Sequence, residues 1–290
     1  MIYTFFRTAF LTSIFCGGTM MKVSKIQTKE QGASILLLKV IVCIIAGLGA
    51  GIGTGLAGLS AAAVISPMLI TFLGFPAYEA VGIALASDVL ASAVSAYTYG
   101  KNRNLDIKNG VVMLGTVLLF TLVGSYIASL VSNSTMGSFS VFMTFFLGLK
   151  FIIRPVMTTK ELQEQKTAAQ KFYQSILCGI VIGFICGFVG AGGGMMMLLM
   201  LTSVLGYELK TAVGTSVFIM TFTAFTGAVS HMAIGGRPDI PALILCIAAT
   251  FTGAQVSAGF ANKAEAKVLN RVTGIVLAIL GLAMIIVKLF

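Results

Sequence analysis

One carboxylate, Asp88, stands inside an otherwise apolar stretch of this chain and begins a stripe of polar side chains. Ser92, Ser95 and Tyr99 follow it at four, seven and eleven positions, so all four lie on one face of a helix. An ionised side chain inside an apolar membrane helix is costly and usually marks a pathway. The stripe therefore suits the coupling of transport to a proton or a sodium ion. The alternative is a structural carboxylate that is protonated or capped by the hydroxyls.

Glycines are the second informative feature. Residues 190–194 read Gly-Ala-Gly-Gly-Gly, with so few Cβ atoms that the backbone amides can approach an anion closely. Glycines spaced by four residues, by contrast, are explained by close helix packing. We therefore predict an anion site rich in backbone groups. The residues predicted to bind the substrate are Gly55, Gly58, Ser60, Gly190, Gly192, Gly193, Gly194, Thr215 and Ser216.

The glycine pattern occurs twice. Gly51 recurs 132 positions later at Gly183, and the small residues around it recur at the same offset. A duplicated apolar unit is typical of transporters whose site lies where the copies meet. The copies differ, because Met220 stands at the position of the carboxylate and His231 at that of the tyrosine. A lone histidine is more often a hydrogen-bonded interface residue than a proton relay. The residues predicted for coupling are Asp88, Ser92, Tyr99 and His231.

The composition places the chain in a membrane. Of its 290 residues, 58% are hydrophobic and 10% are charged, with a mean hydropathy of +1.02, whereas soluble domains carry about 25% charged residues. The net charge of +10 lies mostly in connections without interleaved aromatics, which argues against nucleic-acid binding. The five cysteines have no ligand or redox spacing. We predict a multi-pass protein of the cytoplasmic membrane without a metal site, a cofactor or an enzymatic activity.

The apolar blocks predict an all-α polytopic membrane protein with two homologous repeats of four blocks and about eight transmembrane helices. The opening block of each repeat is too long for a single membrane crossing. Residues 35–73 would form a helix of about 58 Å, whereas the hydrocarbon core is about 30 Å thick. We expect it to break at its glycines. The blocks are 35–73, 78–99, 109–131, 135–153, 174–205, 209–234, 240–261 and 268–290. The predicted segments are an N-terminal tail of unknown role (1–33), the first repeat (34–153), a cytoplasmic linker (154–173) and the second repeat (174–290).

Two topologies fit these blocks. If each opening block crosses the membrane, each repeat crosses four times and the copies are parallel. If it turns back, each repeat crosses three times and the copies are inverted. Basic residues concentrate in cytoplasmic loops, and their count favours parallel copies, which place Arg103, the central basic loop and Arg237 on one side.

The glycine spacing carries a resemblance to a known family. The sequence Gly51-x3-Gly55-x2-Gly58 recurs at 183–190 and is followed by the glycine run and by Ala-Val-Gly-Thr-Ser at 212–216. This arrangement resembles the sulfite exporter TauE/SafE family over residues 35–290. The resemblance implies a secondary permease for small sulfur-containing anions such as sulfite or sulfonates, with 190–194 and 214–216 lining the path. The first copy departs from the pattern, because Leu59-Ser60-Ala61-Ala62 replaces the run.

Other functions use the same residues. A passive anion channel would employ the same backbone donors without alternation. An intramembrane serine protease would use Ser60 as nucleophile and His231 as base, although a duplication does not serve a single dyad. A membrane scaffold without transport is the remaining alternative. The implied partners are a small anion, a coupling proton or sodium ion and lipid, with homo-oligomerisation left open.

Overall fold

The computed structural model describes residues 36–132, 168–189, 193–235 and 237–265, together with positions 149, 268, 271, 275, 279, 282 and 286. The chain divides into two compact units, Met1–Ile41 and Val42–Phe290, and all contacts reported below lie within the second. The predicted tail 1–33 falls outside the described residues, as do most of block 135–153, of the linker and of block 268–290. Gly190 and Gly192 fall outside them as well.

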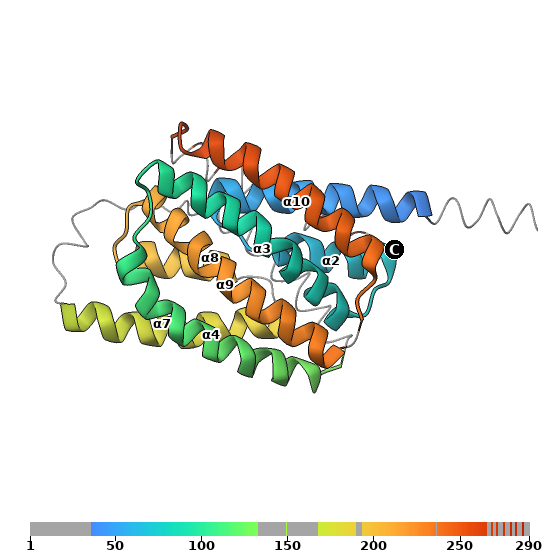
Figure 1. The fold of residues 1–290 in the computed structure, drawn as a ribbon, viewed down its shortest axis with the longest axis horizontal. Coiled ribbons are helices and arrows are strands. Elements are labelled where there is room, and N and C mark those ends of the chain that lie inside the picture. The colour runs from blue at the N-terminus through green and yellow to red at the C-terminus, as the bar shows by residue number, and fades with distance from the viewer. Residues whose placement is uncertain are drawn as a thin grey trace, which may run out of the picture. The chain divides into compact units, whose positions relative to one another are not determined.

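The described residues fold into helices whose ends follow the predicted blocks closely (Figure 1). Two described helices lie in the first predicted block, and three helical segments lie in the fifth. α7 begins inside the segment predicted as a linker. The helices are a first helix Leu36–Ala57, α2 Ala62–Leu73, α3 Ala77–Lys101, α4 Ile107–Ser129, α7 Ala168–Val189, α8 Gly193–Leu199, the π-helical η1 Met200–Val204, α9 Leu209–Gly235 and α10 Ile240–Ala261.

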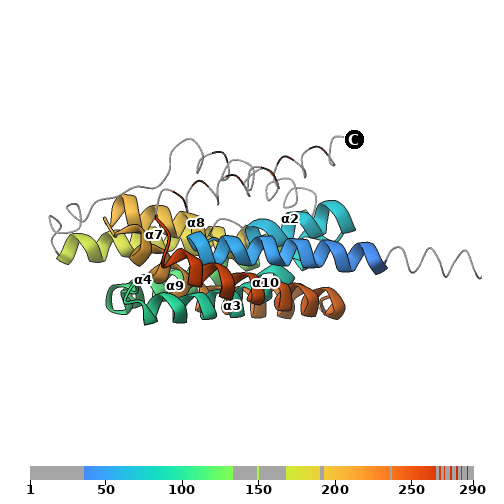
Figure 2. The same ribbon diagram turned by 90° about the horizontal axis from the view of Figure 1, so that it is seen from above.

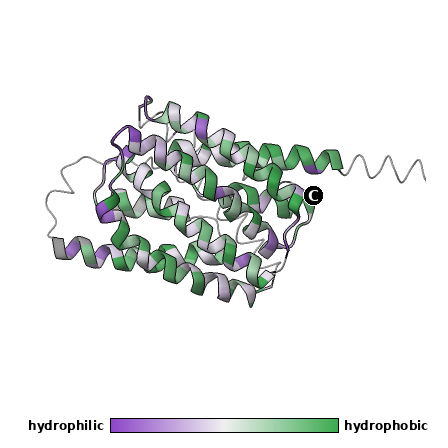
Figure 3. Cartoon of the chain, in the orientation of Figure 1, coloured by the Kyte–Doolittle hydropathy of each residue, from purple (hydrophilic) through white to green (hydrophobic). Residues whose placement is uncertain are grey.

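Five of these helices are long and apolar enough to cross a membrane: the first helix, α3, α4, α9 and α10. Large apolar side chains face outward, since Leu130 is 71% exposed and Val256 is 72% exposed. Hydroxyl side chains such as Ser87 and Thr121 are instead fully buried. Strongly hydrophilic residues gather at the ends of the helices (Figure 3). This distribution suits helices surrounded by lipid, whose polar groups find partners inside the protein.

The described helices of the second unit form two layers. α10, α3, α9 and α4 lie side by side in that order, and their neighbours in the row are in contact. The first helix, α2, α8 and α7 form the other layer (Figure 2). The polar stripe of α3 therefore lies in the middle of the row, where neighbouring helices bury it.

The glycines spaced by four residues pack helices together, as predicted. A Cβ added at Gly51 would collide with the backbone of α10, at the carbonyl of Thr250. A Cβ added at Gly183 would collide with the backbone of α4, at the carbonyl of Val117. The opening helix of each predicted repeat thus packs against the third long helix of the other repeat.

In both opening blocks, described helices end or begin beside glycines. The first helix ends at Ala57, and Gly58 follows in the left-handed region with φ +62°. This conformation is accessible to glycine without a steric penalty. In the second copy α7 ends at Val189 and α8 begins at Gly193. The turns after α2 and η1 resemble each other. The amides of Phe75 and Tyr207 each donate to the carbonyl six residues earlier in the chain.

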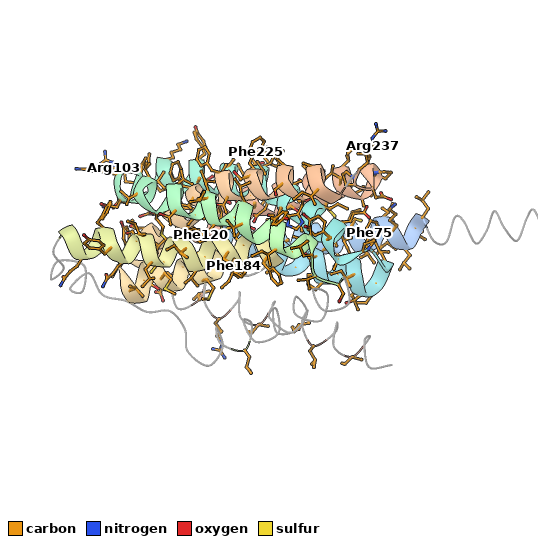
Figure 4. All side chains as sticks on the ribbon, turned by 90° about the horizontal axis from the view of Figure 1, so that it is seen from below. Phe75, Arg103, Phe120, Phe184, Phe225 and Arg237 are labelled. Atoms are coloured by element: carbon orange, nitrogen blue, oxygen red, sulfur yellow. The ribbon has the colours of Figure 1, made fainter. Side chains whose placement is uncertain are left out.

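The middle helices α3 and α9 run antiparallel, which contradicts the parallel arrangement favoured by the loop charges. Gly82 near the start of α3 lies against His231 near the end of α9, and Gly214 near the start of α9 lies against Tyr99 near the end of α3. Arg103 and Arg237, in the loops after these helices, lie at opposite ends of the bundle (Figure 4). The charge count was wrong because it placed these two loops on one side.

Candidate functional site

The first break lies against the start of α8 in the interior. A Cβ added at Gly194, in the first turn of α8, would run into the carbonyl of Gly58, the amide nitrogen of Ser60 and the Sδ atom of Met220. A Cβ added at Gly58 would run into the Oγ atom of Ser216 in α9. Residues predicted from both copies to bind the substrate are therefore brought together.

Asp88 lies beside the first break with its carboxylate fully hydrogen-bonded. Ser60 Oγ donates to Asp88 Oδ2 at 2.8 Å, and Ser92 Oγ donates to Asp88 Oδ1 at 2.9 Å. The backbone amide of Ala61 donates to the same carboxylate, which is 1% exposed. The hydroxyl caps weighed for a structural carboxylate are thus present. Ser95, farther along this face, is buried with no hydrogen-bond partner among the described residues.

The backbone amides around the first break are engaged by the chain itself. The amide of Gly58 donates to the Thr54 carbonyl at 2.9 Å. The amide of Leu59 donates to the Gly53 carbonyl at 3.3 Å. Ala62 donates to Ser60 Oγ at 3.3 Å. The expectation that breaks leave donors ready for a solute is therefore wrong for these amides.

Tyr99 and His231 stand at equivalent positions of the two copies, and each contacts a backbone carbonyl in the last turn of the opening helix of its own copy. Tyr99 donates its hydroxyl to the Gly55 carbonyl at 3.0 Å. His231 contacts the Gly187 carbonyl through Nε2 at 2.9 Å, and its Nδ1 lies 3.2 Å from the Tyr78 carbonyl. The histidine ring stacks on Tyr78 with centroids 4.1 Å apart. Both ring nitrogens thus face carbonyl groups, so the proposed dyad of Ser60 and His231 is not formed.

Removing the hydroxyl of Tyr99 should lower stability. In Tyr99→Phe the Gly55 carbonyl loses its buried donor, and leaving a buried acceptor unsatisfied costs about 1–3 kcal/mol. At about 2–4 °C per kcal/mol for a chain of this size, the thermal midpoint should fall by several degrees. Tyr97→Phe is the matched control because Tyr97 is 72% exposed on the same helix. Equal midpoints for the two variants would contradict a role for this bond.

Thr215 lies away from the breaks, in a polar cluster at the start of α4. Its Oγ1 accepts from the amide of Asp106 at 3.1 Å. Asp106 caps α4 by accepting from the amide of Asn109 at 3.2 Å. Tyr207 donates its hydroxyl to Asp106 Oδ2 at 3.0 Å, and burial, together with this carboxylate, raises the pKa of Tyr207. The cluster holds the α3–α4 connection against the start of α9.

The predicted site residues therefore divide into three groups. Gly58, Ser60, Gly194 and Ser216 meet, and Asp88 with Ser92 adjoins them. Gly55 serves helix packing, since a Cβ there would meet α10. Thr215 lies elsewhere. The sequence reasoning missed the Ala61 amide, Tyr78 and Asp106, and only Asp106 carried a signal, as an Asp three residues before Asn109 at a helix start. Within the described ranges no cluster of three or more His, Cys, Asp or Glu side chains could hold a metal ion.

Helices able to span a bilayer, together with an apolar exterior, define a multi-pass membrane protein. The chain belongs to the family described as sulfite exporter TauE/SafE, which matches residues 43–284. The family resemblance found in the glycine spacing is thereby confirmed. This is a family of membrane transporters.

The chain is also similar to individual proteins of this kind. A probable membrane transporter protein of Bacillus subtilis, YunE, is 27% identical over 270 residues, covering 86% of this chain and 98% of the relative. A probable membrane transporter protein of Methanocaldococcus jannaschii, MJ0441, is 26% identical over 268 residues, covering 87% of this chain and 97% of the relative. No solved structure matches the chain.

Proposed function

We propose that this protein is a secondary transporter that moves a small anion, in the class of sulfite and sulfonates, by alternating access. The observation that carries the proposal is the contact between the first break and the start of α8, where Gly194 lies against the carbonyl of Gly58 and the amide of Ser60. Unwound backbone at membrane depth is tolerated only where protein buries it or where it lines a cavity. The first break supplies irregular backbone of the kind that transporters use at their sites.

The proposed substrate site lies on the second-copy side of this contact. It comprises the described glycines Gly193 and Gly194 with Ser216, which faces the first break from α9. Small anions bind well to backbone amides that carry no side chain to hold them away. The position that holds a carboxylate in the first copy is occupied here by Met220, an apolar residue. The second-copy side thus offers a less repulsive environment for an anion.

We also propose that the two halves are inverted repeats. Their contacts recur at an offset of 132 residues: Tyr99 bonds to the Gly55 carbonyl, and His231 contacts the Gly187 carbonyl. Their middle helices are antiparallel, and a two-fold axis that relates antiparallel helices must lie across them rather than along them. An axis in the membrane plane supports alternating access, because rocking one half against the other exchanges two equivalent arrangements.

Cysteine labelling tests the inversion. The loops after α3 and α9 are equivalent in the two halves, so Arg103→Cys and Arg237→Cys should react from opposite sides of the membrane. The measurement uses a variant without the five native cysteines and an impermeant thiol reagent on intact and inverted vesicles. Each cysteine serves as the control for the other, since both should be labelled once the vesicles are permeabilised. Labelling of both from one side would overturn the inverted arrangement.

Flux in proteoliposomes tests the function itself. Radiolabelled sulfite should accumulate against its concentration gradient when a proton or sodium gradient is imposed, and the accumulation should collapse when that gradient is dissipated. Sulfate, thiosulfate, an alkyl sulfonate and acetate, added as competitors, define the substrate class. Flux that runs only downhill would point to a passive anion channel. Absence of protein-dependent flux for every anion would contradict transport of this class.

A further inference from the structure

The first break already contains a carboxyl group. Three donors converge on the carboxylate of Asp88: the hydroxyls of Ser60 and Ser92, at 2.8 and 2.9 Å, and the amide of Ala61. An ionised carboxylate is an acceptor only, and bonds from donors to an ionised acceptor are roughly twice as strong as neutral ones. The arrangement is the one that a protein gives to a bound carboxylate ligand, except that the carboxylate belongs to the chain.

The position of the carboxylate relative to α2 strengthens this reading. Ala61 directly precedes α2, a helix of 12 residues, and the first amides of a helix form its positive end. Asp88 reaches this end from α3, a separate element. Ser60 Oγ lies between them, since it accepts from the amide of Ala62 and donates to the carboxylate. The negative charge is therefore tied to the start of α2 directly and through one hydroxyl.

The second half lacks this charge at the matching position. Met220 stands 132 residues after Asp88, and its thioether lies against Gly194 at the start of α8. The first break and the start of α8, which touch each other, therefore differ in one decisive neighbouring group.

We propose that Asp88 is a built-in anion that fills the first break and excludes the transported anion from it. Given the proposed transport function, each chain would then carry one substrate anion at the second-copy side rather than one at each break. Asp88 is accordingly a positioning residue that fixes α2 and decides which half binds substrate.

Chemical rescue tests this assignment on the purified full-length protein. Asp88→Ala removes the carboxylate and leaves the donors of Ser60, Ala61 and Ser92 in place, so formate should enter the vacated space. Sodium formate should raise the thermal midpoint of Asp88→Ala by about 2–4 °C beyond its effect on the wild type. Sodium gluconate at equal ionic strength is the control for salt, since gluconate is too large to enter. The assay needs no transport, so its outcome is independent of the proposed function.

Asp88→Asn tests whether this position needs a negative charge or only a neutral group that forms hydrogen bonds. Its amide fills the space, so formate should leave its midpoint unchanged, and its NH2 group faces donors, so that midpoint should lie several degrees below that of the wild type. A midpoint equal to that of the wild type would mean that no charge is needed, and would overturn the proposal. Absence of any formate effect specific to a folded Asp88→Ala protein would overturn it as well. If Asp88→Ala does not fold, the midpoint of Asp88→Asn decides alone.

Discussion

Gly194→Ala should abolish sulfite flux in proteoliposomes while leaving protein in the membrane. The added Cβ would meet the Gly58 carbonyl and the Ser60 amide nitrogen, which are backbone atoms, as well as the flexible thioether of Met220. The thioether can turn aside, but the backbone atoms can yield only if the two breaks move apart. Overpacking of this kind costs about 1–3 kcal/mol, and it acts where the proposed anion binds.

A matched substitution separates this effect from a general effect of alanine. Gly115 also lies within a long helix, α4, and a Cβ added there meets no heavy atom within 4 Å. Gly115→Ala should therefore retain the flux and thermal midpoint of the wild type. Flux is normalised to inserted protein, so that a folding loss in Gly194→Ala is counted separately. Normal flux in Gly194→Ala would remove this contact from the transport path.

The sequence predicted most of the helical organisation because glycine has few uses inside a membrane helix. Spacing by four positions places glycines on one helix face, and Gly51 and Gly183 both pack against a neighbouring helix at such positions. Denser glycines lower the cost of unwinding, and the first helix does end at Ala57, next to Gly58. Period and spacing are local properties, so one sequence is enough to read them.

The relative direction of the two halves is a property that local patterns do not carry. The basic residues of a loop indicate which side of the membrane the loop occupies, but each loop contributes only a few such residues. Arg103 and Arg237 were counted on one side, whereas they lie at opposite ends of the bundle (Figure 4). The antiparallel contacts of α3 and α9 depend on how segments more than 100 residues apart pack together, and composition does not determine that packing.

Around Asp88, too, the local contacts were predictable from the sequence and the long-range contacts were not. Ser92 follows Asp88 by four positions, so helical geometry alone predicted that their side chains meet. Ser60 lies 28 residues before Asp88 and reaches it only because the chain unwinds after Ala57. The sequence predicts that this hydroxyl binds the substrate; in the structure it donates to the chain's own carboxyl group. A break was predictable from glycine content, but the group that satisfies its amides was not.

Met220→Asp should reduce sulfite flux by at least about tenfold, equivalent to about 1.4 kcal/mol in the barrier. The substitution gives the second copy the carboxylate that the first copy has in Asp88. Because Met220 lies against Gly194, the new charge would sit beside the proposed anion site. It would repel the incoming anion and compete with it for the same backbone donors, as Asp88 does for the amide of Ala61.

Two variants at the same position distinguish charge from shape and polarity. Met220→Leu keeps an apolar side chain of similar volume, and swaps of this kind usually cost less than about 1.5 kcal/mol, so most of the flux should remain. Met220→Asn has the shape of aspartate without its charge, so its flux should exceed that of Met220→Asp. Thermal midpoints of all three establish that the proteins are folded before fluxes are compared. If Met220→Asp transports as fast as Met220→Leu, the anion passes elsewhere, since a negative charge against Gly194 would then leave its path untouched.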